Sequence, residues 1–325
     1  MKKRILSGMR PTGKLHLGHL AGALENWVSL QDTYENFHLV ADWHVLTTSY
    51  EKTDKIHELS IEMVTDWLAA GIDPEKSPIF IQSQIKEHAE LFLLFSMLVT
   101  VPRLERNPAV KEQAKSLNIE DNISYGHLGY PVLQAADILL YRANLVPVGE
   151  DQLPHIELCR EIARKFNKTY EYVFKLPEAK LTQFARLPGP DGKRMSKSLG
   201  NVILMSDTPD AVFQVVRTAI TDPAKIRRND PGNPEICNVF TWHKKFNSGE
   251  IPGIDRDCRS GALGCVECKK NCAKQISAYL APIQEKRTLY INNQNLVKDI
   301  IAEGNRKAKI EAAKTMKAVY KAMSF

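Results

Sequence analysis

The sequence predicts an α/β protein in which a doubly wound parallel sheet is followed by a C-terminal all-helical domain. Three observations favour this fold. Short apolar strands alternate with amphipathic helices up to about residue 203. A polar loop over residues 188–201, which contains three glycines, then ends the alternation. Beyond about Asp207 only helical periodicity is present.

The periodicities of apolar residues in strands and in helices predict the elements of the sheet domain in order. A first strand is expected over 3–9, closed by the turn at 11–13 and followed by a helix over 17–28. Further strands are expected over 37–41, 79–81 and 145–148, and further helices over 55–70, 87–99, 128–141 and 153–166.

The chain is expected to close with a helix over 305–323. Its positions Ile310, Ala313, Val319 and Met323 are predicted to face the core. We place the domain boundary just after the polar loop, which gives domains of residues 1–203 and 204–325.

Composition indicates an ordinary globular protein, since 43% of the 325 residues are hydrophobic and 25% are charged. The N-terminal apolar run is too short for a signal peptide, and no stretch has the length of a membrane span. We therefore expect a cytoplasmic protein without a membrane segment.

The net charge is +6, but residues 269–325 alone carry twelve Lys or Arg against four Asp or Glu. This excess is typical of a polyanion-binding surface, although a solvated helix face gives the same pattern.

A first candidate site lies where the first strand passes into the first helix. Free backbone N–H groups and the helix dipole favour phosphate at such a turn. His16 and His19 are three residues apart, so both imidazoles can donate to one group of phosphate oxygens. Gly18 lets a nucleotide approach the backbone. Helix capping and packing are the alternative roles for this histidine pair.

A second candidate site is the loop Gly192–Asn201, which carries three cations and two serine hydroxyls between glycines. Such a loop can close on a polyphosphate and neutralise the charge that develops on a leaving group. A solvated basic loop is the alternative, and the presence of both segments in one chain favours phosphate binding.

Together these segments resemble the two signature motifs of the class I aminoacyl-tRNA synthetases, usually quoted as HIGH and KMSKS. They stand here as His16-Leu17-Gly18-His19 and Arg194-Met195-Ser196-Lys197-Ser198. The resemblance implies a Rossmann-type sheet that binds ATP, with Mg²⁺ accompanying the nucleotide rather than held in a protein cage. Arg194 stands where the family has lysine, and its planar guanidinium is not equivalent to an ammonium group.

Within that class the chain is similar to the tryptophanyl-tRNA synthetases over nearly its whole length. The similarity is carried by SGMRPTG at 7–13, YPVLQAADIL at 130–139 and VPVGEDQ at 146–152, which is followed by HIEL at 155–158. It implies that Asp137 accepts the indole N–H of tryptophan. A tryptophan pocket needs apolar surface and one buried acceptor, and an amino acid without the donor would leave that acceptor unpaired.

The same resemblance assigns the remaining site residues. Those expected to contact tryptophan beside Asp137 are Gln134, Leu6, His44, Tyr130, Val146 and Val148. Those expected around ATP are Arg10, Pro11, Thr12, Gly18, His19, Gly149, Glu150, Asp151, Gln152, Arg194, Met195, Ser196, Lys197 and Ser198. The expected catalytic residues are His16, His19, Arg194, Lys197 and Lys111. For Lys111 a solvated surface role is the alternative, and for Val146 and Val148 it is packing in the strand core.

The reaction implied is ATP-dependent activation of L-tryptophan, followed by transfer to the 3′ end of tRNA(Trp). Residues 1–203 would then form the catalytic domain and residues 204–325 an anticodon-binding domain, in a homodimer. Tyrosyl-tRNA synthetase is the close alternative, but Leu6 stands where those enzymes carry a tyrosine. A catalytically inactive, synthetase-like RNA-binding iron–sulfur protein is a second alternative, and the intact histidine pair and Asp137 argue against it.

Five of the six cysteines fall between residues 237 and 272, in a chain expected to form no disulfides. Cys237, Cys258, Cys265 and Cys268 have the spacing of a metal site for Zn²⁺ or a [4Fe–4S] cluster, and spacing alone does not separate these. The resemblance favours [4Fe–4S], because a bacterial branch of the family carries such a cluster with similar spacing. Cys272 leaves open which four cysteines bind, and Cys159 is expected to be a buried small hydrophobe.

Overall fold

The computed structural model describes residues 2–181 and 187–325, and it confirms the predicted α/β fold. Five parallel strands form one sheet in the order β3-β2-β1-β4-β5, the arrangement of a Rossmann-type sheet. The strands are β1 (Arg4–Met9), β2 (Glu35–Val40), β3 (Ile79–Ile81), β4 (Leu145–Val148) and β5 (Glu178–Leu181). The sequence does not predict strand β5, because EAKL contains no apolar run. In the structure its side chains are exposed or half-exposed.

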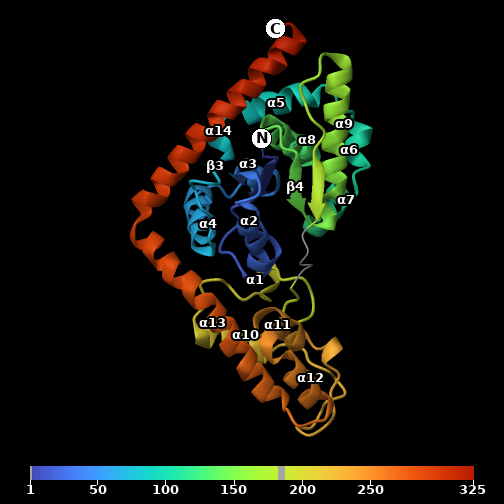
Figure 1. Cartoon of the computed structure of the whole chain (residues 1–325). Helices are drawn as coiled ribbons and strands as arrows, with labels where there is room; N and C mark the ends of the chain where they lie inside the picture. Colours follow the sequence, from blue (N-terminus) through green and yellow to red (C-terminus); the bar gives the residue numbers. More distant parts are fainter. Residues whose placement is uncertain (1, 182–186) are drawn as a thin grey trace.

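Side chains alternate between the two faces of the sheet, as strand geometry requires. On β2, Phe37 and Leu39 join the core beneath α8 and α9, whereas Val40 joins the core beneath α2 and α4. Helices therefore cover both faces (Figure 1). The helices of this part are α1 (Leu17–His19), α2 (Glu25–Leu30), α3 (Trp43–Ser49), α4 (Ile56–Ala70), α5 (Glu87–Ser96), α6 (Val101–Glu105), α7 (Pro108–Leu117), α8 (Tyr125–Leu140) and α9 (Leu153–Thr169), with 3-10 turns η2 (Gln82–Gln84) and η3 (Glu150–Gln152).

The single helix expected over 17–28 is interrupted. A π-helical segment, η1 (Leu20–Leu24), separates α1 from α2. Widened turns of this kind are frequent at functional sites, and this one directly follows the histidine pair.

The rest of the chain is helical, as predicted, and its last two helices are long (Figure 1). Its elements are η4 (Lys197–Leu199), α10 (Pro209–Arg217), η5 (Pro234–Ile236), α11 (Asn238–Phe246), η6 (Ser248–Glu250), α12 (Ile251–Arg259), α13 (Cys265–Asn292) and α14 (Gln294–Met323). Helix α13 leads away from the group formed by α10, α11 and α12, and α14 then runs along the outside of the sheet part to the C-terminus.

The expected last helix was wrong in its start and in part of its buried face. Helix α14 begins at Gln294, and both Ile310 and Ala313 are exposed. Val319 is buried and Met323 packs against the same core, as predicted, but the other buried positions there are Ala308, Ala312 and Met316, which pack into the core beneath α8. Two of these three are alanines. Their small size permits a close approach of the helix, which a search for large apolar residues at helical spacing does not reveal.

Helix α14 protects the open edge of the sheet. A Cβ on Gly304 would lie 1.8 Å from the carbonyl oxygen of Ile79 on edge strand β3, so the contact requires glycine. The next residue, Asn305, accepts the backbone N–H of Ile81 through Oδ1 at 2.9 Å. An edge strand that would otherwise offer unpaired backbone groups is thereby covered.

In the described residues, no helix has the length and apolar character needed to cross a membrane.

Candidate active site

A cavity of about 260 Å³ opens at the carboxyl ends of β1 and β4. This is the position where the strand order reverses and where doubly wound sheets bind their ligands. Six of the seven residues expected to contact tryptophan line it: Leu6, His44, Tyr130, Gln134, Asp137 and Val146. Val148 is buried nearby but is not among the described lining residues, whereas Gln152, expected near ATP, lines this cavity.

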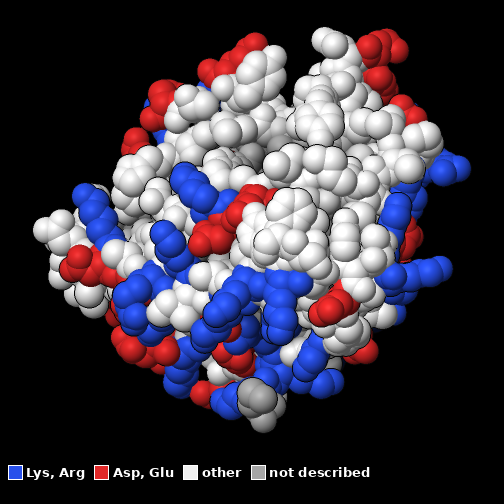
Figure 2. All heavy atoms as spheres, turned by 90° about the horizontal axis from the view of Figure 1, so that it is seen from above, with Lys and Arg blue, Asp and Glu red and all other residues white. Residues whose placement is uncertain are grey.

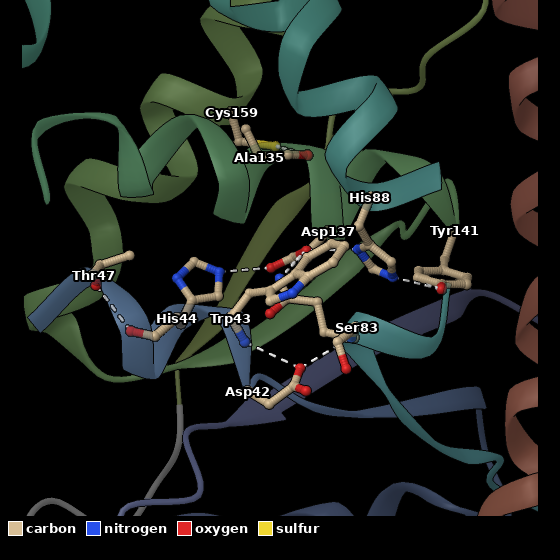
Figure 3. A network of polar contacts seen from close by, with 11 residues as sticks. Asp42, Trp43, His44, Thr47, Ser83, His88, Ala135, Asp137, Tyr141 and Cys159 are labelled. Atoms are coloured by element: carbon tan, nitrogen blue, oxygen red, sulfur yellow. Dashed lines mark hydrogen bonds and ion pairs between the residues drawn. The ribbon is translucent and has the colours of Figure 1, made fainter. Parts of the chain in front are cut away.

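Asp137 is buried on α8 and holds three side-chain donors. His44 Nε2 lies 2.8 Å from its Oδ2, whereas Gln82 Nε2 at 2.7 Å and His88 Nδ1 at 2.6 Å both contact its Oδ1. His44 and His88 approach the carboxylate from opposite sides (Figure 3). Burial opposes ionisation of this group, but the hydrogen bonds from His44 and His88 outweigh burial and lower the pKa of Asp137. The cavity therefore contains a buried, charged acceptor.

Asp42 joins two of the three elements that carry these donors. Its Oδ1 accepts the backbone N–H of Trp43 at 3.0 Å, which caps α3, and also that of Ser83 at 3.0 Å (Figure 3). One carboxylate oxygen thus joins the helix that carries His44 to the turn that carries Gln82.

Tyr130 faces the same cavity and is held by a second histidine. Its hydroxyl lies 3.1 Å from His155 Nε2, and the Asn107 amide lies 3.3 Å from His155 Nδ1. Burial lowers the pKa of His155 to about 4, so the ring is neutral at pH 7. An amide that donates to Nδ1 leaves the proton on Nε2, which then donates to Tyr130.

The histidine pair lies in a second cavity, of about 120 Å³, whose lining includes His16, Gly18, His19, Arg194 and Met195. The two imidazoles also cap the helix, as the alternative interpretation predicted. His16 Nδ1 accepts the N–H of Gly18 at 3.1 Å, and His19 Nδ1 accepts the N–H of His16 at 3.3 Å.

Capping and phosphate binding are compatible here. Because each Nδ1 accepts, each neutral ring carries its proton on Nε2, and that N–H is the donor available to a phosphate. Burial, with Lys197 and Arg194 nearby, lowers the pKa of His16 to about 4. Burial and the neighbouring His16 lower the pKa of His19 to about 3. Gly18 faces the His16 ring, whose atoms would lie 3.0 Å from an added Cβ.

The cationic loop is joined to the first turn. The backbone of Leu17 donates to Ile203 at 2.9 Å, and that of Met205 donates to Leu15 at 2.9 Å. Lys197 Nζ donates to the carbonyl of Thr12 at 3.0 Å and would lie 3.2 Å from a Cβ on Gly13, whose φ is +114°. The two segments, far apart in sequence, therefore form one site.

The interior of the loop is organised by Asn201, which sequence reasoning did not identify as functional. Its Oδ1 accepts the N–H of Ser196 at 2.7 Å, and its Nδ2 donates to Asp191 at 2.8 Å and to the carbonyl of Arg194 at 3.1 Å. Met195 is buried and anchors the loop in the core, whereas Arg194 is exposed.

A family model for class I tRNA synthetases (W and Y) matches residues 1–281. The chain belongs to this family. Tryptophan–tRNA ligase of Thermotoga maritima is 53% identical over 99% of both chains, and that of Aquifex aeolicus is 44% identical over 99% of both. A solved structure of tryptophanyl-tRNA synthetase from Campylobacter jejuni, complexed with ADP and tryptophan, superposes with a TM-score of 0.89 at 31% identity, covering 99% of this chain and 100% of that one.

Other expected residues of this synthetase lie outside the two cavities. Lys111 is exposed on α7, and Gly149, Glu150 and Asp151 are exposed after β4; none is among the described lining residues. Arg10 lines the first cavity. Pro11 is buried, and Thr12 is exposed and contacts Lys197 through its carbonyl. The side chain of Ser198 lies outside the described part of the structure.

Sequence reasoning missed Gln82, His88 and Tyr141. Gln82 and His88 contact Asp137 on the side away from the cavity, and Tyr141 contacts His88. Gln82 directly follows β3, so the convergence of parallel strand ends at one edge could have identified it. His88 and Tyr141 give no local signal, because only the packing of α5 against α8 brings them together.

The cysteines of this synthetase gather among α11, α12 and the first turns of α13. Burial raises the pKa of the Cys237, Cys258 and Cys268 thiols, that of Cys268 to about 12, and neighbouring thiols add to each shift. Cys268 Sγ also lies 3.5 Å from His243 Nε2. Among the described residues, however, no three or more His, Cys, Asp or Glu are arranged as ligands of one metal ion. Cys159 is fully buried in the sheet core, as expected.

Proposed function

We propose that the protein is a tryptophan–tRNA ligase, which activates L-tryptophan with ATP and transfers it to the 3′ end of tRNA(Trp). The observation that carries this proposal is Asp137, an ionised acceptor in a cavity that also offers the apolar side chains of Leu6 and Val146. Such a cavity fits a flat apolar ring with a single donor. The reaction is a step of translation, which we place in the cytoplasm.

In the first step the tryptophan carboxylate attacks the α-phosphorus of ATP, and the bond to pyrophosphate breaks as the new anhydride bond forms. The protein's contribution is positioning and charge stabilisation. The Nε2–H groups of His16 and His19 would donate to phosphate oxygens, and Lys197 with Arg194 would stabilise the departing pyrophosphate. Mg²⁺ supplies additional charge neutralisation when it is bound with ATP.

The experiment that tests this function is ATP–pyrophosphate exchange with each of the twenty amino acids. Tryptophan alone should support rapid exchange. Exchange supported by tyrosine instead would favour the alternative specificity. That outcome is disfavoured because Leu6 lines the cavity and offers no partner for a phenol hydroxyl. No exchange with any amino acid would favour a non-catalytic RNA-binding protein.

We assign tRNA binding to the helical part, residues 204–325, with residues 1–203 as the catalytic domain. An open groove between α10 and α13 carries Lys270 and Lys274 beside apolar Phe213, and both cations can contact a phosphate backbone. The variant K270E/K274E should lower tRNA charging and leave tryptophan-dependent exchange unchanged. Equal charging by variant and wild type would contradict this placement.

The Cys237, Cys258, Cys265 and Cys268 thiols are proposed to hold a [4Fe–4S] cluster rather than Zn²⁺. The donor set supports this, since thiolates are the ligands of such clusters and these four cysteines come from one small region among α11, α12 and the start of α13. Among the described residues, their side chains are not arranged as the ligands of one ion. Protein purified without oxygen should contain about four iron atoms per chain and absorb near 400 nm, whereas colourless protein with one zinc ion would contradict the proposal.

A homodimer is proposed as the functional assembly. The end of the molecule that carries α5 and the C-terminus has Lys and Arg crowded on one side and a broad uncharged area on the other (Figure 2). Leu93 on α5, Met97 directly after it and Val101 at the start of α6 are exposed by 55%, 71% and 53%. Such exposed apolar groups are typical of an interface. Light scattering should give twice the chain mass, and L93D/M97D should give monomers.

A further inference from the structure

Three side chains of the protein donate to Asp137, the acceptor in the cavity, before any substrate binds. Of the three side chains that hold Asp137, only His44 lines the cavity; Gln82 and His88 are fully buried and are not among the described lining residues. Both contact Oδ1, whereas His44 contacts Oδ2. The two carboxylate oxygens therefore differ: Oδ1 bonds to the protein behind the cavity, and Oδ2 is beside a group that faces the cavity.

Counting the acceptor positions identifies the one left for a ligand. An ionised carboxylate has about four lone-pair positions, two on each oxygen. Gln82 and His88 occupy both positions of Oδ1, and His44 occupies one position of Oδ2. A single position on Oδ2 remains for a substrate donor.

Tyr141 fixes the direction of these hydrogen bonds. Its hydroxyl lies 2.8 Å from His88 Nε2, on the far side of the ring from Asp137 (Figure 3). Burial, with Asp137 and Glu87 nearby, keeps the pKa of Tyr141 well above its usual range, so the hydroxyl stays protonated and donates. His88 then accepts at Nε2 and donates through Nδ1–H to Oδ1.

This chain of groups is not a nucleophilic triad. Tyr141 and His88 are both fully buried in the sheet core, where Tyr141 also packs against Phe37 and Phe80. No reacting atom can reach them, so they act only through Asp137.

We propose that Gln82, His88 and Tyr141 are positioning residues that determine substrate specificity: they occupy Oδ1 of Asp137 and leave one position of Oδ2 for a ring N–H. The inference rests on the proposed function and extends it to three residues outside the cavity. A carboxylate held in this way cannot turn to another donor when a ring without N–H enters. Such a ring therefore leaves the acceptor unpaired and is rejected.

The test compares tryptophan with an analogue in which sulfur replaces the indole N–H, β-(benzothiophen-3-yl)alanine, as substrates for ATP–pyrophosphate exchange. The measured quantity is the ratio of kcat/KM for the two. In H88F and Y141F this ratio should fall, by about 10–100-fold for H88F and less for Y141F, because the freed carboxylate can turn or take up a proton. H88N restores a donor near the Nδ1 position and should recover much of the ratio.

The control is H38N. His38 is as fully buried as His88, on β2, but it packs against Trp27 and Trp67 rather than the site. This variant should lose stability and keep the wild-type ratio. A second readout is the pH dependence of kcat/KM for tryptophan, whose acid limb should move to higher pH in H88F as Asp137 becomes easier to protonate.

The outcomes separate this inference from the proposed function. An unchanged ratio in both H88F and Y141F, with wild-type exchange intact, would overturn the inference alone and show that the two residues only support packing. Wild-type protein without tryptophan-dependent exchange would overturn the proposed function, and this inference with it.

Discussion

Among single residues, Asp137 is the acceptor on which tryptophan recognition depends. In D137N the amide nitrogen cannot accept an indole N–H and meets the donors of His44, Gln82 and His88. Tryptophan-dependent exchange should fall by about 10²-fold or more in kcat/KM, since hydrogen bonds to charged groups are strong and buried donors would be left unpaired. Thermal unfolding of the same variant separates loss of the site from loss of the fold. A variant with wild-type kinetics would contradict the assignment.

The histidine pair gives a prediction about pH. The pKa of His16 is lowered to about 4 and that of His19 to about 3, so both rings are neutral throughout pH 5.5–8. In H19N the loss of exchange activity relative to wild type should therefore be independent of pH over this range. A ratio that changes with an inflection near pH 6.5 would show instead that His19 works as a charged imidazolium.

At the scale of elements, α13 joins the helical part to the first turn of the site. Arg287 on α13 contacts the buried Asp66 of α4 at 2.6 Å, and Asp66 accepts the N–H of Leu15, next to His16, at 3.3 Å. In R287M the Asp66 carboxylate loses its charged partner, which costs about 3–5 kcal/mol when a buried pair is broken. Urea unfolding should show this loss, and the KM for ATP should rise.

The double variant R287M/D66N provides the control, because it removes the uncompensated charge of the buried Asp66 and leaves only that of Glu62, the more exposed second partner of Arg287. It should recover much of the stability lost in R287M. An R287M protein as stable as wild type would show that the pair is open to solvent and leaves α4 unaffected.

The sequence predicted the bounds of elements well where apolar periodicity was strong. It predicted poorly which side chains are buried where this depends on contacts between distant elements. Strands 79–81 and 145–148 match their predicted bounds. The face of α14 was wrong at Ile310, because alanines rather than large residues make that contact. In the site, His44 and Gln134 were predicted from resemblance, whereas His88 depends on the contact between α5 and α8, which no local pattern encodes.

At the scale of the whole molecule, buried neutral histidines make folding depend on pH. Burial lowers the pKa of His38 to about 3 and that of His155 to about 4, whereas an unfolded histidine titrates near 6.5. The unfolded chain therefore binds more protons between about pH 4 and 6.5, so the stability present above pH 6.5 is lost as the pH falls. Each such histidine contributes a slope of about 1.4 kcal/mol per pH unit.

Urea unfolding between pH 4.5 and 7.5 measures this dependence. The free energy of unfolding should fall steeply below pH 6, and H38N should show a shallower slope than wild type. An H38N slope equal to that of wild type would mean that His38 is protonated in the folded protein, against its burial beside Trp27 and Trp67 with no hydrogen-bond partner in the described residues.

The most direct measurement is a crystal structure of the protein soaked with tryptophan. We predict that the indole nitrogen lies within about 3 Å of Asp137 Oδ2, while Oδ1 keeps its contacts with Gln82 and His88. An indole bound outside this cavity, or a carboxylate turned so that Oδ1 meets the ring, would contradict this prediction.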